Sequence, residues 1–179
     1  MRHPGYHRWS ALALGAFLAS ASPARAALIT YDLTGDWTGK ITCNVFAGGV
    51  KQKIVLTPTM HVSQIGQNIG VEIELGLGSK RYAGLANPDA KKPEQKGETA
   101  LILCGTDNVL GATSPDEIGR MSVSAKPGKV KASLKGLSFY SDVDDHGTCK
   151  WSMKRISTTD PGVTTDCSTT MMIQTGGAR

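Results

Sequence analysis

Residues 37–45 read WTGKITCNV, and apolar and polar side chains alternate along most of this stretch. A strand places successive side chains on opposite faces of a sheet, so the alternation predicts a strand. The apolar face would carry Trp37, Ile41, Cys43 and Val45, and the polar face Thr38, Lys40, Thr42 and Asn44. Such a strand covers a core from one side and meets water on the other.

The same period of two continues through most of the chain, and helical periodicity is nearly absent. Glycine, proline and asparagine mark the turns between the alternating stretches. The strand at 98–104 is apolar on both faces, and we assign Ala100 and Ile102 to its inner face. The sequence predicts an all-β fold with strands at residues 37–45, 50–65, 69–75, 80–86, 98–104, 118–126, 129–140 and 146–156.

Pro58 decides the number of strands. If residues 50–65 form one strand bent at Pro58, the chain has eight strands, and an antiparallel up-and-down barrel can close. If Pro58 reverses the chain, there are nine strands and a two-sheet β-sandwich is expected instead. We expect the barrel. A membrane barrel turns apolar residues toward lipid, whereas nearly every strand here has one face with Lys, Glu, Ser or Thr, which predicts a polar outer face.

The first and last strands also suggest how the barrel closes. A guanidinium can stack on an indole, and directly opposed cysteines can form a disulfide. Both contacts become possible in a register in which paired residue numbers sum to 192. That register pairs Trp37 with Arg155, Ile41 with Trp151, and Cys43 with Cys149. We adopt this register as a hypothesis because it gives three chemically reasonable pairs at once.

Gly35-Asp36-Trp37 at the opening of the first strand, with Arg155 late in the last one, resembles the lipocalin and calycin pattern. In that pattern the tryptophan packs under an arginine from the closing strand. The resemblance implies a lipocalin-like eight-stranded barrel with an internal pocket. The Gly-x-Trp-x-Gly stretch at 35–39, Gln64-Ile65-Gly66 and the paired cysteines are also similar to small secreted bacterial β-proteins of unknown function.

The first 26 residues have the features of a secretory signal peptide. Two arginines give a positive start, residues 11–19 are apolar, and Ala24-Arg25-Ala26 fits a signal-peptidase site. The apolar stretch is far shorter than the roughly 20 residues that a membrane-spanning helix needs. We therefore expect cleavage near Ala26/Ala27, a single domain over residues 27–179, and a secreted or periplasmic protein.

Loss of that segment changes the charge of the chain. It holds three of the 20 basic residues and none of the 15 acidic ones, which leaves 17 basic against 15 acidic residues, or +2. This near-neutral balance argues against nucleic-acid binding. The lysines at 91–92 and within 129–135 are interpreted as a solvated loop and a solvated strand face.

All four cysteines follow residue 26, and an even number in an exported chain favours two disulfides. We expect Cys43 to pair with Cys149 and Cys104 with Cys167, so that the second bond tethers the C-terminal tail. There is no CxxC pair for a metal. Residues 142–145 partly match the start of a calcium loop, but a hairpin turn accounts for them more simply. Asp142, Asp144 and Asp145 are therefore only weak metal candidates.

The interior positions are mostly of modest size, so the barrel could enclose a small apolar ligand. The same side chains could instead fill it. The candidate pocket residues are Trp37, Ile41, Val71, Ile73, Tyr82, Ile102, Val123, Leu134, Trp151 and Arg155. An alternative is a protease inhibitor or surface-interaction protein that binds a protein partner through the loops at 105–117 and 141–147.

No catalytic constellation emerges from the sequence. His61 is expected to be an exposed histidine rather than a general base, and there is no Gly-x-Ser-x-Gly motif. His146 adjoins two aspartates, which makes a local acid and imidazole pair. We expect a non-enzymatic protein without a cofactor, which binds a small hydrophobic ligand or a protein and does not insert stably into a membrane.

Overall fold

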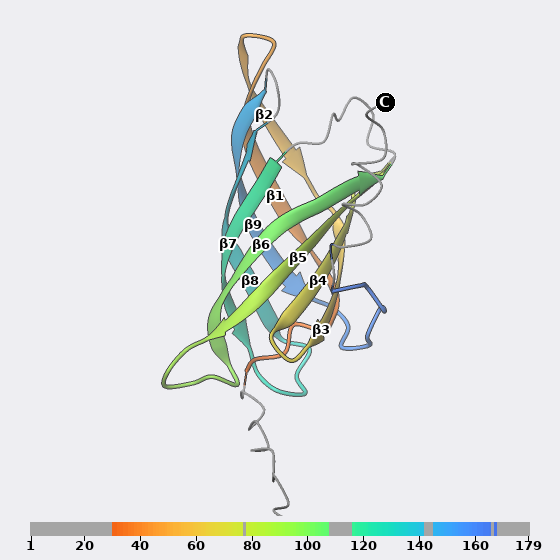
Figure 1. Ribbon diagram of the computed structural model, residues 1–179, viewed down its shortest axis with the longest axis vertical. Helices are drawn as coiled ribbons and strands as arrows, with labels where there is room; N and C mark the ends of the chain where they lie inside the picture. Colours follow the sequence, from red (N-terminus) through yellow and green to blue (C-terminus); the bar gives the residue numbers. More distant parts are fainter. Residues whose placement is uncertain (1–29, 77, 108–115, 142–144, 166, 168–179) are drawn as a thin grey trace, which may run out of the picture.

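The computed structural model describes residues 30–165 and 167, apart from residues 77, 108–115 and 142–144. The described part contains strands and no helix, so none of it could span a membrane as a helix. Figure 1 shows the strands wound into one barrel. They are β1 (Gly35–Ala47), β2 (Val50–Leu56), β3 (Thr59–Ile65), β4 (Asn68–Glu74), β5 (Ser79–Pro88), β6 (Lys96–Asp107), β7 (Asp116–Ala125), β8 (Ala132–Ser141) and β9 (His146–Arg155).

The barrel is closed and antiparallel. Each strand from β3 to β9 pairs with its neighbour in sequence, and β1 pairs with both β3 and β9. β2 and β3 share one register against β1, because Ile41 pairs with Leu56 and Thr38 with Thr59. The chain thus bends at Pro58 without reversing, which confirms the eight-stranded up-and-down barrel, with β2 as an additional strand that extends β3.

The expected closing register is also confirmed. The pairs are Trp37 with Arg155, Ile41 with Trp151, and Cys43 with Cys149. A disulfide joins Cys43 to Cys149 across this seam. The core lies inside the barrel and includes the largest fully buried side chains. They are Trp37, Trp151, Tyr31, Leu33, Met60, Ile69, Ile73, Leu101, Met121, Leu134, Met153 and Val62.

Three expectations about strand faces and bounds are wrong. Ala100 and Ile102 point outward, and Ile102 is 55% exposed, because the inward positions of β6 go to Leu101, which is 1% exposed, and Leu103, which pairs with inward-facing Tyr82. β7 begins at Asp116, so Glu117 belongs to a strand rather than a loop. β8 begins only at Ala132, which leaves Lys129 and Lys131 in the connection before it.

Residues 156–165 and 167 form a strap across the outside of the barrel, drawn in blue beside β3 and β4 in Figure 1. Its start is anchored by Ile156, whose amide donates to the Asp36 carbonyl at 2.8 Å. Its end is held by the expected disulfide between Cys167 and Cys104 of β6. The two disulfides are compatible with an extracellular or periplasmic protein.

Two glycines allow the strap to lie close to the sheet. A Cβ atom on Gly70 would sit 2.1 Å from the Thr164 carbonyl oxygen, and one on Gly35 would sit 1.9 Å from the Ser157 oxygen. Ser63 holds the strap between them, since its hydroxyl donates to Asp160 and accepts the Val163 amide at 2.8 Å. These contacts explain why outward-facing Ser63 is only 3% exposed.

Candidate functional site

The lower end of the barrel is closed by side chains. The Arg155 guanidinium lies 5.6 Å from the Trp37 ring centre, as the sequence predicted, and donates to the carbonyls of Asp32, Thr34 and Lys129. Residues 30–34 then cross beneath the strands, which buries Tyr31 and Leu33 completely. Burial raises the pKa of Tyr31 to about 12.

Nine of the ten predicted pocket residues do face the interior, and Ile102 is the exception. The nine are between 0% and 5% exposed, and neighbouring methionines and leucines are equally buried. Side chains therefore pack against one another along the interior. Binding of an apolar ligand in the interior stays a prediction. Two other arrangements of side chains are candidate functional sites.

The first arrangement is a buried polar cluster near the upper end of the barrel, centred on Glu117. One carboxylate oxygen, Oε2, accepts from Lys80 Nζ and from the Tyr82 hydroxyl, each at 2.9 Å. The other accepts from the Ser138 hydroxyl at 2.6 Å, and Trp151 Nε1 donates to that same hydroxyl at 2.9 Å. The Glu117 side chain is only 3% exposed, so three donors compensate the removal of a carboxylate from water.

The cluster orients the upper core. Burial and the Glu117 carboxylate raise the pKa of Tyr82 well above its usual value, so the phenol remains a donor. Tyr82 also meets Trp151 edge to face, with ring centres 5.7 Å apart. Sequence reasoning missed Glu117 and Lys80, because a carboxylate and an ammonium read as surface residues until the barrel brings β5 and β7 together.

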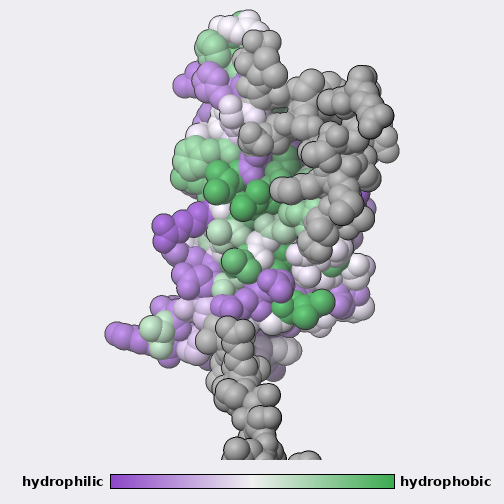
Figure 2. All heavy atoms as spheres, in the orientation of Figure 1, coloured by the Kyte–Doolittle hydropathy of each residue, from purple (hydrophilic) through white to green (hydrophobic). Residues whose placement is uncertain are grey.

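The second arrangement is an apolar area on the outside of β5–β8, which we call the outer apolar face. Five of its large side chains are between 48% and 59% exposed. Two rows of paired outward positions build it: one runs through Ile102, Ile118 and Phe139, and the other through Leu85, Ala100, Arg120 and Leu137. In Figure 2 hydrophobic residues gather on this side of the molecule. Contiguous exposed patches of this kind mark interaction sites more often than scattered apolar residues do.

Two grooves are cut into the outer apolar face. The larger has a volume of about 460 Å³, and Leu85, Ala100, Ile118 and Phe139 contribute to its walls. Arg120 and Glu98 also line it, and Arg120 Nε donates to Glu98 Oε2 at 2.9 Å. The smaller groove, of about 300 Å³, runs from Ile102 and Phe139 to Glu117.

His61 lies outside the barrel between two carboxylates. Its Nδ1 is 2.7 Å from Asp36 Oδ1, and its Nε2 is 3.4 Å from Glu74 Oε1. Partial burial lowers the pKa of His61, but the hydrogen bond to Asp36 and the nearby charges outweigh burial, so the pKa is raised. Within the described ranges no group of three or more His, Cys, Asp or Glu side chains could hold a metal ion.

Residues 108–115 and 142–144 of the two loops proposed as a partner surface lie outside the described residues, and with them the metal candidates Asp142 and Asp144. Of the remainder, residues 105–107, 116–117, 141 and 146–147 belong to strands and not to loops. Asp145 accepts from the Gly48 amide at 3.3 Å, and the His146 ring contacts Phe46 with centres 5.3 Å apart. Both contacts belong to the junction between the β1–β2 turn and β9.

Comparison with known proteins found no relative: no protein-family model matches the sequence, and no curated protein matches it.

Proposed function

We propose that this chain is an exported, non-enzymatic binding protein that holds the hydrocarbon chain of an amphiphile on its outer apolar face. The sequence predicted a small apolar ligand inside the barrel, and we propose that an apolar ligand binds on the outside of the barrel instead. The observation that carries the proposal is the pair of rows on β5–β8, in which five large apolar side chains remain about half exposed. Export, with cleavage near Ala26/Ala27, and the kinship with lipocalin-like barrels belong to the same proposal.

The chemistry of the face supports a hydrocarbon group. The strands beneath it are paired on both sides along its length, so backbone donors and acceptors are already used in the ladders. Its large side chains are aliphatic or aromatic, and the one charged position within its two rows, Arg120, is paired with Glu98. The larger groove, at about 460 Å³, falls within the range of small-ligand sites, roughly 300–1,000 Å³.

Interior packing supports an outside site as well. Trp37, Met121, Leu134 and Met153 are each 0–1% exposed, which leaves no solvent-sized gap against these side chains. A ligand inside would have to displace close-packed atoms, whereas a ligand outside removes exposed apolar surface from water.

A neutral solvatochromic dye tests the proposal. Nile red should bind the disulfide-bonded protein with a blue-shifted emission, and a non-ionic alkyl detergent below its micelle concentration should displace it. Contact with the dye removes part of the Ile118 and Phe139 side chains from water, and each side chain contributes about 1 kcal/mol to the binding free energy. Changing both, Ile118→Ser with Phe139→Ser, should therefore weaken binding about tenfold or more.

Val55→Ser is the matched control for these changes, because Val55 is 49% exposed on β2 and lies outside the outer apolar face. It should leave dye binding unchanged. The proposal is wrong if the wild-type protein does not bind the dye, or if the double variant binds it as tightly as the control.

A further inference from the structure

Six lysines occupy outward positions on four adjacent strands, and we call them the lysine face. All six are exposed, and in the described part of the chain none forms a salt bridge. The single acidic residue in these four strands is Asp36, which is bonded to His61. The lysine face consists of Lys135 on β8, Lys150 and Lys154 on β9, Lys40 on β1, and Lys51 and Lys53 on β2.

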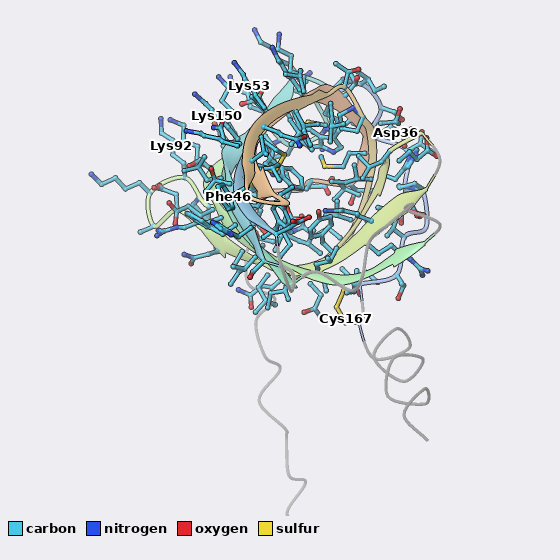
Figure 3. All side chains as sticks on the ribbon, turned by 90° about the horizontal axis from the view of Figure 1, so that it is seen from above. Asp36, Phe46, Lys53, Lys92, Lys150 and Cys167 are labelled. Carbon is cyan, nitrogen blue, oxygen red and sulfur yellow. A yellow bond between two sulfur atoms is a disulfide. The ribbon has the colours of Figure 1, made fainter. Side chains whose placement is uncertain are left out.

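Charge is segregated around the barrel. Figure 3 shows Lys53 and Lys150 projecting on one side and Asp36 lying on another. β4 lies opposite β8 in the ring of strands, and its outward positions carry Glu72 and Glu74. The positive lysine face therefore results from where the residues are placed, since the chain beyond residue 26 has a net charge of only +2, from 17 basic and 15 acidic residues.

The lysine face and the outer apolar face meet along β8. Leu137 of the apolar face pairs with Lys150 across the β8–β9 ladder, and Lys135 lies two residues before Leu137 on the same side of β8. β7, β8 and β9 are adjacent in the closed barrel, so a surface laid against β8 also faces β7 and β9. Centred on β8, it would meet apolar Ile118, Leu137 and Phe139 beside Lys135, Lys150 and Lys154.

We propose that the protein docks on an anionic phospholipid bilayer through β7–β9, with the lysines at the headgroups and the apolar side chains toward the acyl chains. This inference rests on the proposed function, because the same outer apolar face receives the hydrocarbon. Lysines act as point charges without the planar geometry of an arginine fork, which suits a diffuse anionic surface. Phe139 is the one aromatic side chain among the six residues named for this surface, so the surface does not offer the series of aromatic rings on which nucleic-acid bases stack.

The expected strength follows from the number of lysines. Each lysine near an anionic bilayer contributes about fivefold to the partition coefficient. Three lysines on β8 and β9 therefore contribute about a hundredfold. The contribution declines with added salt because mobile ions screen charges at the surface.

Vesicle co-sedimentation with the disulfide-bonded protein tests the proposal. Vesicles of phosphatidylcholine with roughly one-third phosphatidylglycerol should bind the protein, and vesicles of phosphatidylcholine alone should bind it at least tenfold more weakly. Changing Lys135, Lys150 and Lys154 to Gln should weaken binding to the anionic vesicles about a hundredfold. As a control, Gln67→Glu with Asn68→Asp and Thr159→Glu makes the same change in net charge on the β3–β4 side, and should weaken binding only a few-fold.

Three results would overturn this inference: equal binding to both vesicle types, no binding to anionic vesicles at low salt, or an equal effect of the two triple variants. Vesicle-independent, salt-sensitive binding to DNA or to polyglutamate would assign the lysine face to an acidic macromolecule instead. The lysine variant should still bind Nile red. If the wild-type protein binds Nile red but does not bind anionic vesicles, bilayer docking alone fails; if the wild-type protein does not bind Nile red, the proposed function itself fails.

Discussion

Glu117 is a carboxylate that the barrel buries only because its neighbours supply donors. Lys80, Tyr82 and Ser138 all bond to it, from two other strands. Removing one side of a buried ion pair strands the other side, which costs more than the pair itself contributes. The cluster is therefore a place where a single change should have a large effect on the free energy of unfolding.

We predict that Glu117→Leu lowers the free energy of unfolding by about 2–4 kcal/mol, because the Lys80 ammonium and two hydroxyls lose their acceptor. Adding Lys80→Met should restore at least about 1 kcal/mol, since the stranded charge is removed. Urea denaturation of the disulfide-bonded proteins measures both effects. No loss in the single variant, or a further loss in the double variant, would show that the carboxylate does not hold the cluster.

His61 should make stability depend on pH. Its folded pKa is raised above 6.5, so the fold favours the protonated ring. The resulting stabilisation is fully present below pH 6.5 and is lost as pH rises through the folded pKa. The advantage of wild type over His61→Gln in urea denaturation should therefore be larger near about pH 5 than near about pH 8. Asp36→Asn should reduce this difference, and an advantage that grows with pH would contradict the assignment.

Residue identities alone led to part of the site. Trp37 and Arg155 could be paired because a guanidinium and an indole have a specific way of stacking, and the structure has that contact. Ile102 was placed on the wrong face because β6 is apolar at successive positions, so alternation gives no preferred side. Glu117 and Lys80 were not found, because only the three-dimensional fold shows that a charged side chain has partners inside.

At the scale of elements, the strap is the least expected feature. Residues 156–165 contain no alternating pattern, yet they pack closely enough to exclude a Cβ at Gly70. The disulfide at Cys104 was predicted from the even number of cysteines, but the route of the chain toward it was not. The strands, by contrast, follow the period of two, and the bend at Pro58 follows from the shared register of β2 and β3.

We predict that Gly70→Ala lifts the strap from β4, because the added Cβ would lie 2.1 Å from the Thr164 oxygen. The Val163 amide, which donates to Ser63, should then exchange with solvent about tenfold faster or more. Hydrogen exchange followed by mass spectrometry measures this change, with Asn68→Ala on the same strand as the control. Unchanged protection of Val163 would mean that the strap tolerates the methyl group and is not seated by this contact.

Across the whole molecule, different sides of the barrel carry different kinds of side chain. The interior holds the core and one polar cluster, β5–β8 present the outer apolar face, β8–β9–β1–β2 present the lysine face, and the strap covers β3 and β4. Alternation within single strands predicted a polar outer face, because it does not show which outward side chains become neighbours on adjacent strands. The outer apolar face arises only when the registers of four strands bring Leu85, Ile102, Ile118, Leu137 and Phe139 together.

Fluorescence quenching by an alkyl maltoside brominated along its chain tests most directly where a hydrocarbon binds. The barrel contains two tryptophans, Trp37 and Trp151, and both are buried inside it. The wild-type emission should therefore change little, whereas Phe139→Trp should add an indole on the outer apolar face whose emission the bromine quenches at the same detergent concentrations. Quenching of the wild-type tryptophans would place the hydrocarbon inside the barrel, and an unquenched indole at position 139 would contradict binding on the outer apolar face.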